Sequence, residues 1–138
     1  MLNLSAEASA ALEARLSEEI VAWVTTVTGG GQPQSSPVWF LWADGEFLVY
    51  AQPHSWKVRN IRANPRVSLH LNSDEAGNRV ATFEGSARIC EEDPPAEEVP
   101  AYLAKYRGGI AGIGVTPEQL GAEYPTALRI TPARVRVY

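Results

Sequence analysis

Cysteine and histidine are nearly absent from this 138-residue sequence, which contains only Cys90, His54 and His70 of these two residue types. A single cysteine excludes a disulfide within the chain and any metal site built from several cysteines. The two histidines have no metal-ligand spacing with the cysteine or with a carboxylate, so we expect no metal site. Because no disulfide is available, a reducing compartment fits, and we expect a cytoplasmic protein.

The sequence also lacks an apolar run of transmembrane length, and its first residues do not combine a basic region with an apolar core. We therefore expect neither a membrane-bound protein nor a secretion signal. The net charge of −4 and the pI of about 5.2 argue against general nucleic-acid binding, which requires a basic surface. With 45 % hydrophobic residues, the chain is long and apolar enough to bury a core, and we expect one domain over residues 1–138.

The most informative part of the sequence begins with a predicted strand over residues 34–43. This strand is apolar on both faces from Pro37 onward, whereas strict alternation would leave one face polar. Both faces therefore need cover. The protein's own core covers one of them, and a helix, a partner subunit or a flat ligand are the alternatives for the other. Asp44 and Gly45 then predict a hairpin turn, because glycine adopts a positive φ readily, and residues 46–51 form the returning strand.

Next, the sequence predicts a short helix over residues 56–63 that begins with positive charge. Ser55 is a candidate N-cap, and the Asn64-Pro65 pair ends the helix. The first turn of a helix has free N–H groups and the positive end of the helix dipole, so it favours an anion, and Lys57 adds a full charge there. The positive charge continues along the chain through three arginines, Arg59, Arg62 and Arg66. A simpler interpretation of the same residues is an N-capped, solvent-exposed basic helix.

The other elements are predicted from periodicity and turn residues. They are a helix over residues 4–16 with Ser5 as N-cap, strands over 19–27, 66–71, 80–90 and 125–137, and helices over 96–106 and from Pro117, capped by Thr116. Gly85 and Pro132 each predict an irregularity in their strand. Residues 108–115 (GGIAGIGV) follow a helix rather than a strand, so we interpret them as a flexible connection and not as a dinucleotide loop. Strands joined mostly by hairpins predict an antiparallel barrel.

Three segments of the sequence, in their order and spacing, resemble a known family. They are residues 35–50 (SSPVWFLWADGEFLVY), 54–69 (HSWKVRNIRANPRVSL) and 81–89 (ATFEGSARI). Together they resemble the flavin-type split-barrel family related to pyridoxamine 5′-phosphate oxidase, and within it the branch that uses the deazaflavin coenzyme F-420. The resemblance covers about residues 22–136 and implies a mainly β fold, a six-stranded antiparallel split β-barrel. It also implies a homodimer with cofactor sites between the subunits.

The resemblance implies roles for two groups of residues. Lys57 would contact the cofactor phosphate, and the phosphate site would also contain Ser55, Trp56 and Asn60. The isoalloxazine-like ring would lie along Pro37, Val38 and Trp39, with Tyr50 and Ala51 beside it. No residue is assigned a catalytic role, and residues 108–124 are expected to line or gate the substrate side.

Three functions remain open at this point. The preferred one is an oxidoreductase that transfers a hydride between the deazaflavin and an unidentified small organic substrate, with the cofactor supplying the chemistry. An FMN-binding oxidase or reductase of the same superfamily is the second, and a non-catalytic cofactor or heme carrier on the same fold is the third. The arginines after Lys57 suit the longer anionic tail of the deazaflavin better than the terminal phosphate of FMN. The basic pair with which pyridoxamine phosphate oxidases bind FMN and substrate is not located after the third strand, which argues against pyridoxamine phosphate oxidation itself.

Overall fold

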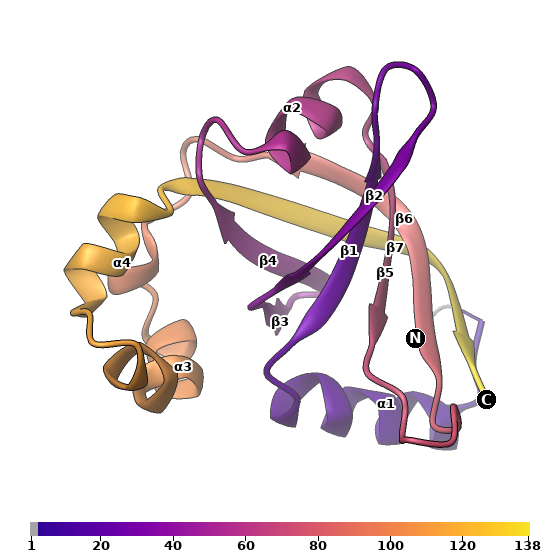
Figure 1. The fold of residues 1–138 in the computed structure, drawn as a ribbon. Coiled ribbons are helices and arrows are strands. Elements are labelled where there is room, and N and C mark those ends of the chain that lie inside the picture. The colour runs from indigo at the N-terminus through magenta and orange to yellow at the C-terminus, as the bar shows by residue number, and fades with distance from the viewer. Residues whose placement is uncertain (1–2) are drawn as a thin grey trace.

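The computed structural model describes residues 3–138 as a curled antiparallel sheet with α1 at one end, α2 at the other, and α3 and α4 beside it (Figure 1). Along the chain, the elements are α1 (Ala6–Glu18), β1 (Ala22–Val27), β2 (Pro33–Val38), β3 (Leu41–Ala43), β4 (Glu46–Ala51), α2 (Trp56–Ala63), β5 (Arg66–Leu71), β6 (Ala81–Ile89), the 3₁₀ turn η1 (Ala96–Glu98), α3 (Pro100–Gly112), α4 (Pro117–Glu123) and β7 (Thr126–Val137). The strands pair in the order β2-β1-β5-β6-β7-β4-β3, and each neighbouring pair is antiparallel. The predicted mainly β, split-barrel fold is therefore confirmed.

The prediction of six strands is wrong by one, because the strand expected over residues 34–43 is interrupted and the sheet has seven. β2 pairs with β1, while β3 pairs with β4 at the opposite end of the strand order. Between them, Trp39 and Phe40 belong to neither ladder. The Phe40 N–H donates to Tyr106 Oη at 2.8 Å, and the Phe40 carbonyl accepts from Lys105 Nζ at 2.9 Å. Two side chains of α3 thus satisfy backbone groups that a neighbouring strand would otherwise bond.

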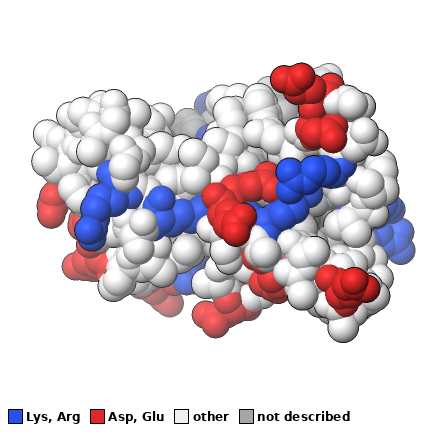
Figure 2. Space-filling view, turned by 90° about the horizontal axis from the view of Figure 1, so that it is seen from below, with Lys and Arg blue, Asp and Glu red and all other residues white. Residues whose placement is uncertain are grey.

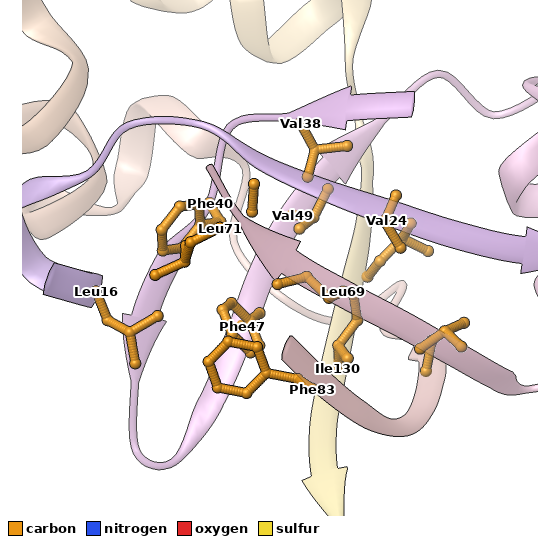
Figure 3. Close-up of a cluster of buried hydrophobic side chains, with 14 of the residues drawn as sticks. Leu16, Val24, Val38, Phe40, Phe47, Val49, Leu69, Leu71, Phe83 and Ile130 are labelled. Atoms are coloured by element: carbon orange, nitrogen blue, oxygen red, sulfur yellow. The ribbon is translucent and has the colours of Figure 1, made fainter. Parts of the chain in front are cut away.

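Alternation along β4 divides its side chains between two apolar clusters. Phe47 and Val49 belong to the cluster inside the curled sheet (Figure 3), where the Phe47 ring meets the Phe83 ring edge to face at 4.9 Å. Leu48 and Tyr50 point the other way and join a second cluster, which is formed with α3 and α4. Trp39 and Leu41, on the second apolar face of the interrupted strand, pack against this second cluster. The helix side of the molecule therefore covers that part of the face, whereas Pro37 stays exposed.

Helix α1 closes one end of the barrel (Figure 1). Ser5 caps its first turn through a side-chain hydrogen bond, as predicted, and its apolar stripe is buried at Leu12 and Leu16. The helix continues to Glu18, beyond its predicted end. The first strand consequently begins at Ala22 and is shorter than predicted.

Acidic and basic side chains lie next to one another on the face that carries α1 (Figure 2). Arg15 and Glu19, at the end of this helix, form one such pair at 2.5 Å. Because acidic and basic side chains are interspersed, this face has no large patch of a single charge sign. Over residues 3–138, none of the helices has the length and apolar character needed to cross a membrane.

The glycine-rich residues 108–115 are partly helical, so the prediction of a flexible connection is wrong for their first half. α3 begins at Pro100 and continues to Gly112, whereas the helix was predicted to end at residue 106. Ile110 explains the difference, because it is 2 % exposed and packs in the second cluster. Burial of one face of α3 thus overrides the low helix propensity of its glycines.

Gly85 sits at a register shift between β6 and β7, which confirms the predicted irregularity. It pairs with Pro132, whereas its neighbour Glu84 pairs with Arg134, so one residue of β7 is left unpaired. The two backbones approach so closely that a Cβ at Gly85 would lie 2.1 Å from the Thr131 carbonyl oxygen. Only a residue without a side chain fits this contact without moving the strands.

We expect Gly85→Ala to lower the free energy of unfolding by at least about 2 kcal/mol, because the clash is with backbone and forces the strands apart. Gly108→Ala is the matched control, since this exposed glycine of α3 has no atom within 4 Å of an added Cβ. It should raise stability by about 0.5–1 kcal/mol through helix propensity. Urea unfolding at equilibrium measures both, and equal midpoints for Gly85→Ala and the parent would contradict the close approach.

Candidate functional site

A cavity of about 220 Å³ lies between the sheet and the α3–α4 side of the molecule. Its first wall is formed by the end of β2, the neighbouring Trp39 and the end of β4, and it is mostly apolar. The Trp39 ring stacks on Tyr106 of α3, with ring centres 4.6 Å apart and planes inclined by 10°. Gly109, on the next turn of α3, leaves room for this ring, because a Cβ there would lie 3.2 Å from it. The interruption of the strand thus turns Trp39 toward α3 and fixes it as a flat surface of the cavity.

The second wall comes from the start of α2, where Ser55 and Lys57 line the cavity. Ser55 occupies the N-cap position with an extended backbone, as predicted, but its side chain makes no capping hydrogen bond. Its Oγ is buried and has no hydrogen-bond partner within residues 3–138. In a helix that begins with an ordinary N-cap, this oxygen would accept from a first-turn N–H group. The hydroxyl and the first-turn N–H groups are therefore both free to bond a ligand.

Lys57 adds an unpaired positive charge to this wall. It is half-buried, and no ion pair joins it to another residue in the described part of the chain. Burial lowers the pKa of Lys57 below the ordinary lysine value, because the charged form loses solvation and gains no acidic neighbour. An anion bound beside Lys57 would restore that lost stabilisation. A lysine, a hydroxyl and a helix N-terminus together form the geometry expected of a phosphate site.

The third wall is contributed by α3, α4 and the residues beside them: Tyr102, Ile113, Leu120 and Tyr124. Tyr102 meets the ring of Tyr50, on β4, edge to face at 5.2 Å. Tyr50 donates its hydroxyl to the Pro94 carbonyl at 2.8 Å, and burial raises its pKa to about 12. This wall carries no charged side chain, so the cavity is apolar toward α3 and α4 and positive toward α2.

The structure brings seven of the nine residues implied by the family resemblance to this cavity: Pro37, Val38, Trp39, Tyr50, Ala51, Ser55 and Lys57. Trp56 and Asn60 lie outside it. Asn60 is buried and donates to Thr26 Oγ1 and Gln34 Oε1, both at 2.9 Å, so it ties α2 to β1 and β2. Trp56 is 39 % exposed on the surface of α2.

Sequence reasoning missed Tyr102 and Gln52, which also line the cavity. Ile113, Leu120 and Tyr124 fall within residues 108–124, the segment expected to line or gate the substrate side. The spacing of four between Tyr102 and Tyr106 indicates one helix face, but it does not tell which partner that face meets.

Comparison with known proteins gives one family match and several similar folds. A family model described as "Pyridoxamine 5′-phosphate oxidase" matches residues 8–138. A conserved hypothetical protein from Mycobacterium tuberculosis is 24 % identical, with a TM-score of 0.75 over 96 % of this chain and 84 % of that one. An F420 reductase is 22 % identical, with a TM-score of 0.69 over 90 % and 94 %. A heme storage protein from Vibrio cholerae is 19 % identical, with a TM-score of 0.67 over 93 % and 92 %.

We expect Ser55→Ala to leave the free energy of unfolding unchanged within about 0.5 kcal/mol, because it removes a buried hydroxyl that bonds nothing in the chain. Thr116→Ala is the matched control, since Thr116 and Gln119 form a complete capping box at the start of α4. Loss of that cap should cost about 0.5–2 kcal/mol. The two variants are compared by urea unfolding, and equal losses would show that Ser55 serves the helix rather than a ligand.

Proposed function

This chain belongs to the pyridoxamine 5′-phosphate oxidase family, and from that premise we propose that it is an oxidoreductase using the deazaflavin coenzyme F-420. In this proposal the coenzyme lies in the cavity described above and exchanges a hydride with a small organic substrate. The coenzyme supplies the hydride chemistry, so the protein has to bind the coenzyme, orient its ring against the substrate and exclude water. The residues that line the cavity include no catalytic triad, which fits a reaction whose chemistry comes from the coenzyme.

The observation that carries the proposal is the unpaired Ser55 and Lys57 at the start of α2. Their free hydroxyl and ammonium groups fit a phosphate ester, which accepts charge-assisted hydrogen bonds. The apolar surface of Trp39, next to Pro37 and Val38, fits a flat tricyclic ring. These residues would therefore hold the two ends of a flavin-type molecule, the phosphate at α2 and the ring along β2.

The arginines of the α2 region favour the deazaflavin over FMN. Arg59 and Arg66 are exposed, and neither forms an ion pair among residues 3–138. Arg62 lies 3.8 Å from Glu91, but both side chains are more than half exposed, so this ion pair contributes little to stability. The acidic glutamyl tail of the deazaflavin would find these charges beyond the phosphate site, whereas FMN ends at its phosphate.

FMN is the second candidate, because the family match and the phosphate site suit it equally well. A heme carrier has less support from this cavity. One similar structure is a heme storage protein, but neither His54 nor His70 lines the cavity. An imidazole ligand to iron would have to come from elsewhere.

We also propose that a second copy of the chain completes the site. A volume of about 220 Å³ lies below the roughly 300–1,000 Å³ typical of ligand pockets, so it is too small for ring, tail and substrate together. Ile113 lines the cavity and is 58 % exposed, which leaves an apolar surface at its rim without cover.

Light scattering at micromolar concentration should therefore give twice the 15.0 kDa mass of one chain. Ile113→Glu places a charge on the exposed rim and should shift the mass toward that of the monomer, with little effect on the fold. A monomer mass for the parent, both with and without coenzyme, would exclude the shared site.

Titration of F-420 and of FMN into the protein tests the cofactor assignment. We expect tryptophan fluorescence to change with either ligand, because Trp39 lines the cavity, and we expect tighter binding of F-420. Lys57→Ala should raise the dissociation constant about tenfold to a hundredfold, which is what loss of roughly 1.5–3 kcal/mol from a charge-assisted hydrogen bond implies. Affinity of the parent should fall as the pH rises through the lowered pKa of Lys57, since the neutral amine no longer attracts the phosphate.

Lys57→Arg is the matched control, because its charge persists at high pH and should flatten the pH dependence. Arg62→Ala should weaken F-420 binding less than Lys57→Ala, and added salt should reduce its effect. Tighter binding of FMN than of F-420 would move the assignment to the second candidate. Unchanged binding by Lys57→Ala would show that the phosphate site lies elsewhere.

A further inference from the structure

Tyr102 of α3 is a buried tyrosine whose hydroxyl has no hydrogen-bond partner within residues 3–138. Its side chain is only 3 % exposed, and it lines the cavity. In the described part of the chain, the side-chain nitrogen and oxygen atoms that are both shielded from solvent and unpaired are Ser55 Oγ and Glu97 Oε2. The Tyr102 oxygen is not among them, so it keeps contact with open space, which we place at the cavity. A hydroxyl that faces the cavity and has no partner in the chain is available to a ligand there.

The neighbouring tyrosines show that this position is unusual. Tyr50 bonds the Pro94 carbonyl, and the Tyr106 hydroxyl accepts from the Phe40 N–H. The ring of Tyr102 is held between these two, 5.2 Å from the Tyr50 ring and 4.9 Å from the Tyr106 ring. Its hydroxyl is therefore fixed in place before any ligand arrives, so little ordering entropy is lost when the ligand binds.

The surroundings of Tyr102 define the chemistry that its hydroxyl would meet. Burial raises the pKa of Tyr102 above its usual range, so the phenol stays protonated and acts as a donor. The same wall is completed by Ile113, Leu120 and Tyr124, without a charged group. Lys57, the charged residue of the cavity lining, belongs to the opposite wall at α2. A charged substrate would lose solvation here and gain no counter-charge, whereas a neutral acceptor would gain a hydrogen bond.

We propose that Tyr102 donates a hydrogen bond to the uncharged carbonyl oxygen of a flat, apolar substrate, and that this contact selects cyclic ketones over hydrocarbons of the same shape. The inference rests on the proposed function, because it assigns the α3–α4 wall to the substrate and the α2 wall to the coenzyme. Tyr102 is thereby a specificity-determining residue of the hydride-transfer site.

Two probes of equal shape test this assignment. They are 1-tetralone, a neutral bicyclic ketone, and tetralin, the same ring system without the oxygen. Equilibrium dialysis of the purified full chain, first alone and then with F-420, gives the ratio of their affinities. Tyr102→Phe should weaken 1-tetralone binding about twofold to tenfold, as expected for one neutral hydrogen bond, and leave tetralin binding unchanged. Its melting temperature should equal that of the parent, because no hydrogen bond within the chain is lost.

Tyr138→Phe is the control, since it removes the hydroxyl of a tyrosine that is 78 % exposed and does not line this cavity. It should leave the affinity ratio of the two probes unchanged. The assignment is overturned if Tyr102→Phe keeps the parent's ratio, if Tyr138→Phe changes it as much, or if 1-tetralone does not bind the parent. Weaker F-420 binding by Tyr102→Phe would also overturn it, by placing the hydroxyl on the coenzyme. Failure of F-420 to bind the parent overturns the proposed function instead, and the dialysis without coenzyme separates the two results.

Discussion

The backbone of Phe40 joins the sheet to the helices through hydrogen bonds that no strand provides. A buried N–H or carbonyl without a partner costs roughly 1–3 kcal/mol, so an interruption between β2 and β3 needs substitutes for the missing ladder. Tyr106 and Lys105 of α3 supply them. Lys105 also reaches the Leu16 carbonyl at 3.3 Å and lies over the Phe40 ring at 3.7 Å, so one cation links α1, the interruption and α3. Burial lowers the pKa of Lys105 to about 8. Its two hydrogen bonds to carbonyl oxygens and its contact with the aromatic ring nevertheless favour the charged form of the amine.

This junction determines the shape of the cavity as well as the closure of the barrel. Once Tyr106 is fixed at Phe40, helix geometry places Tyr102 one turn earlier on the same face, toward β4. The same Tyr106 ring forms the surface on which Trp39 stacks. The position of two walls of the cavity thus depends on α3. The third wall, at α2, is held independently by the hydrogen bonds of the buried Asn60 amide to β1 and β2.

The sequence predicted local features well and long-range partners poorly. The N-cap position of Ser55, the charge of Lys57 and the glycine at the β6 irregularity depend on neighbours along the chain, so pattern and propensity reveal them. The interruption at Phe40 depends on hydrogen bonds of 2.8 and 2.9 Å to two side chains more than 60 residues away in the sequence. The pattern of residues 34–43 does not predict these partners. For the same reason α3 was predicted too short, because its glycines are compatible with a helix only once Ile110 is buried. Family resemblance supplied the cavity residues on the strands and at α2, but not the tyrosine on α3.

Gly109 gives the cavity a property that its lining residues do not reveal. This glycine is exposed on α3 and lies outside the cavity, yet the ring of Trp39 occupies the space that a side chain would need. A methyl group there would meet Trp39 Cη2 at 3.2 Å, so the ring would have to move by a few tenths of an ångström toward the cavity or along the stack. One substitution at this position would change the room available to a ligand while every lining residue stayed the same. The size of the cavity therefore depends in part on a residue that does not line it.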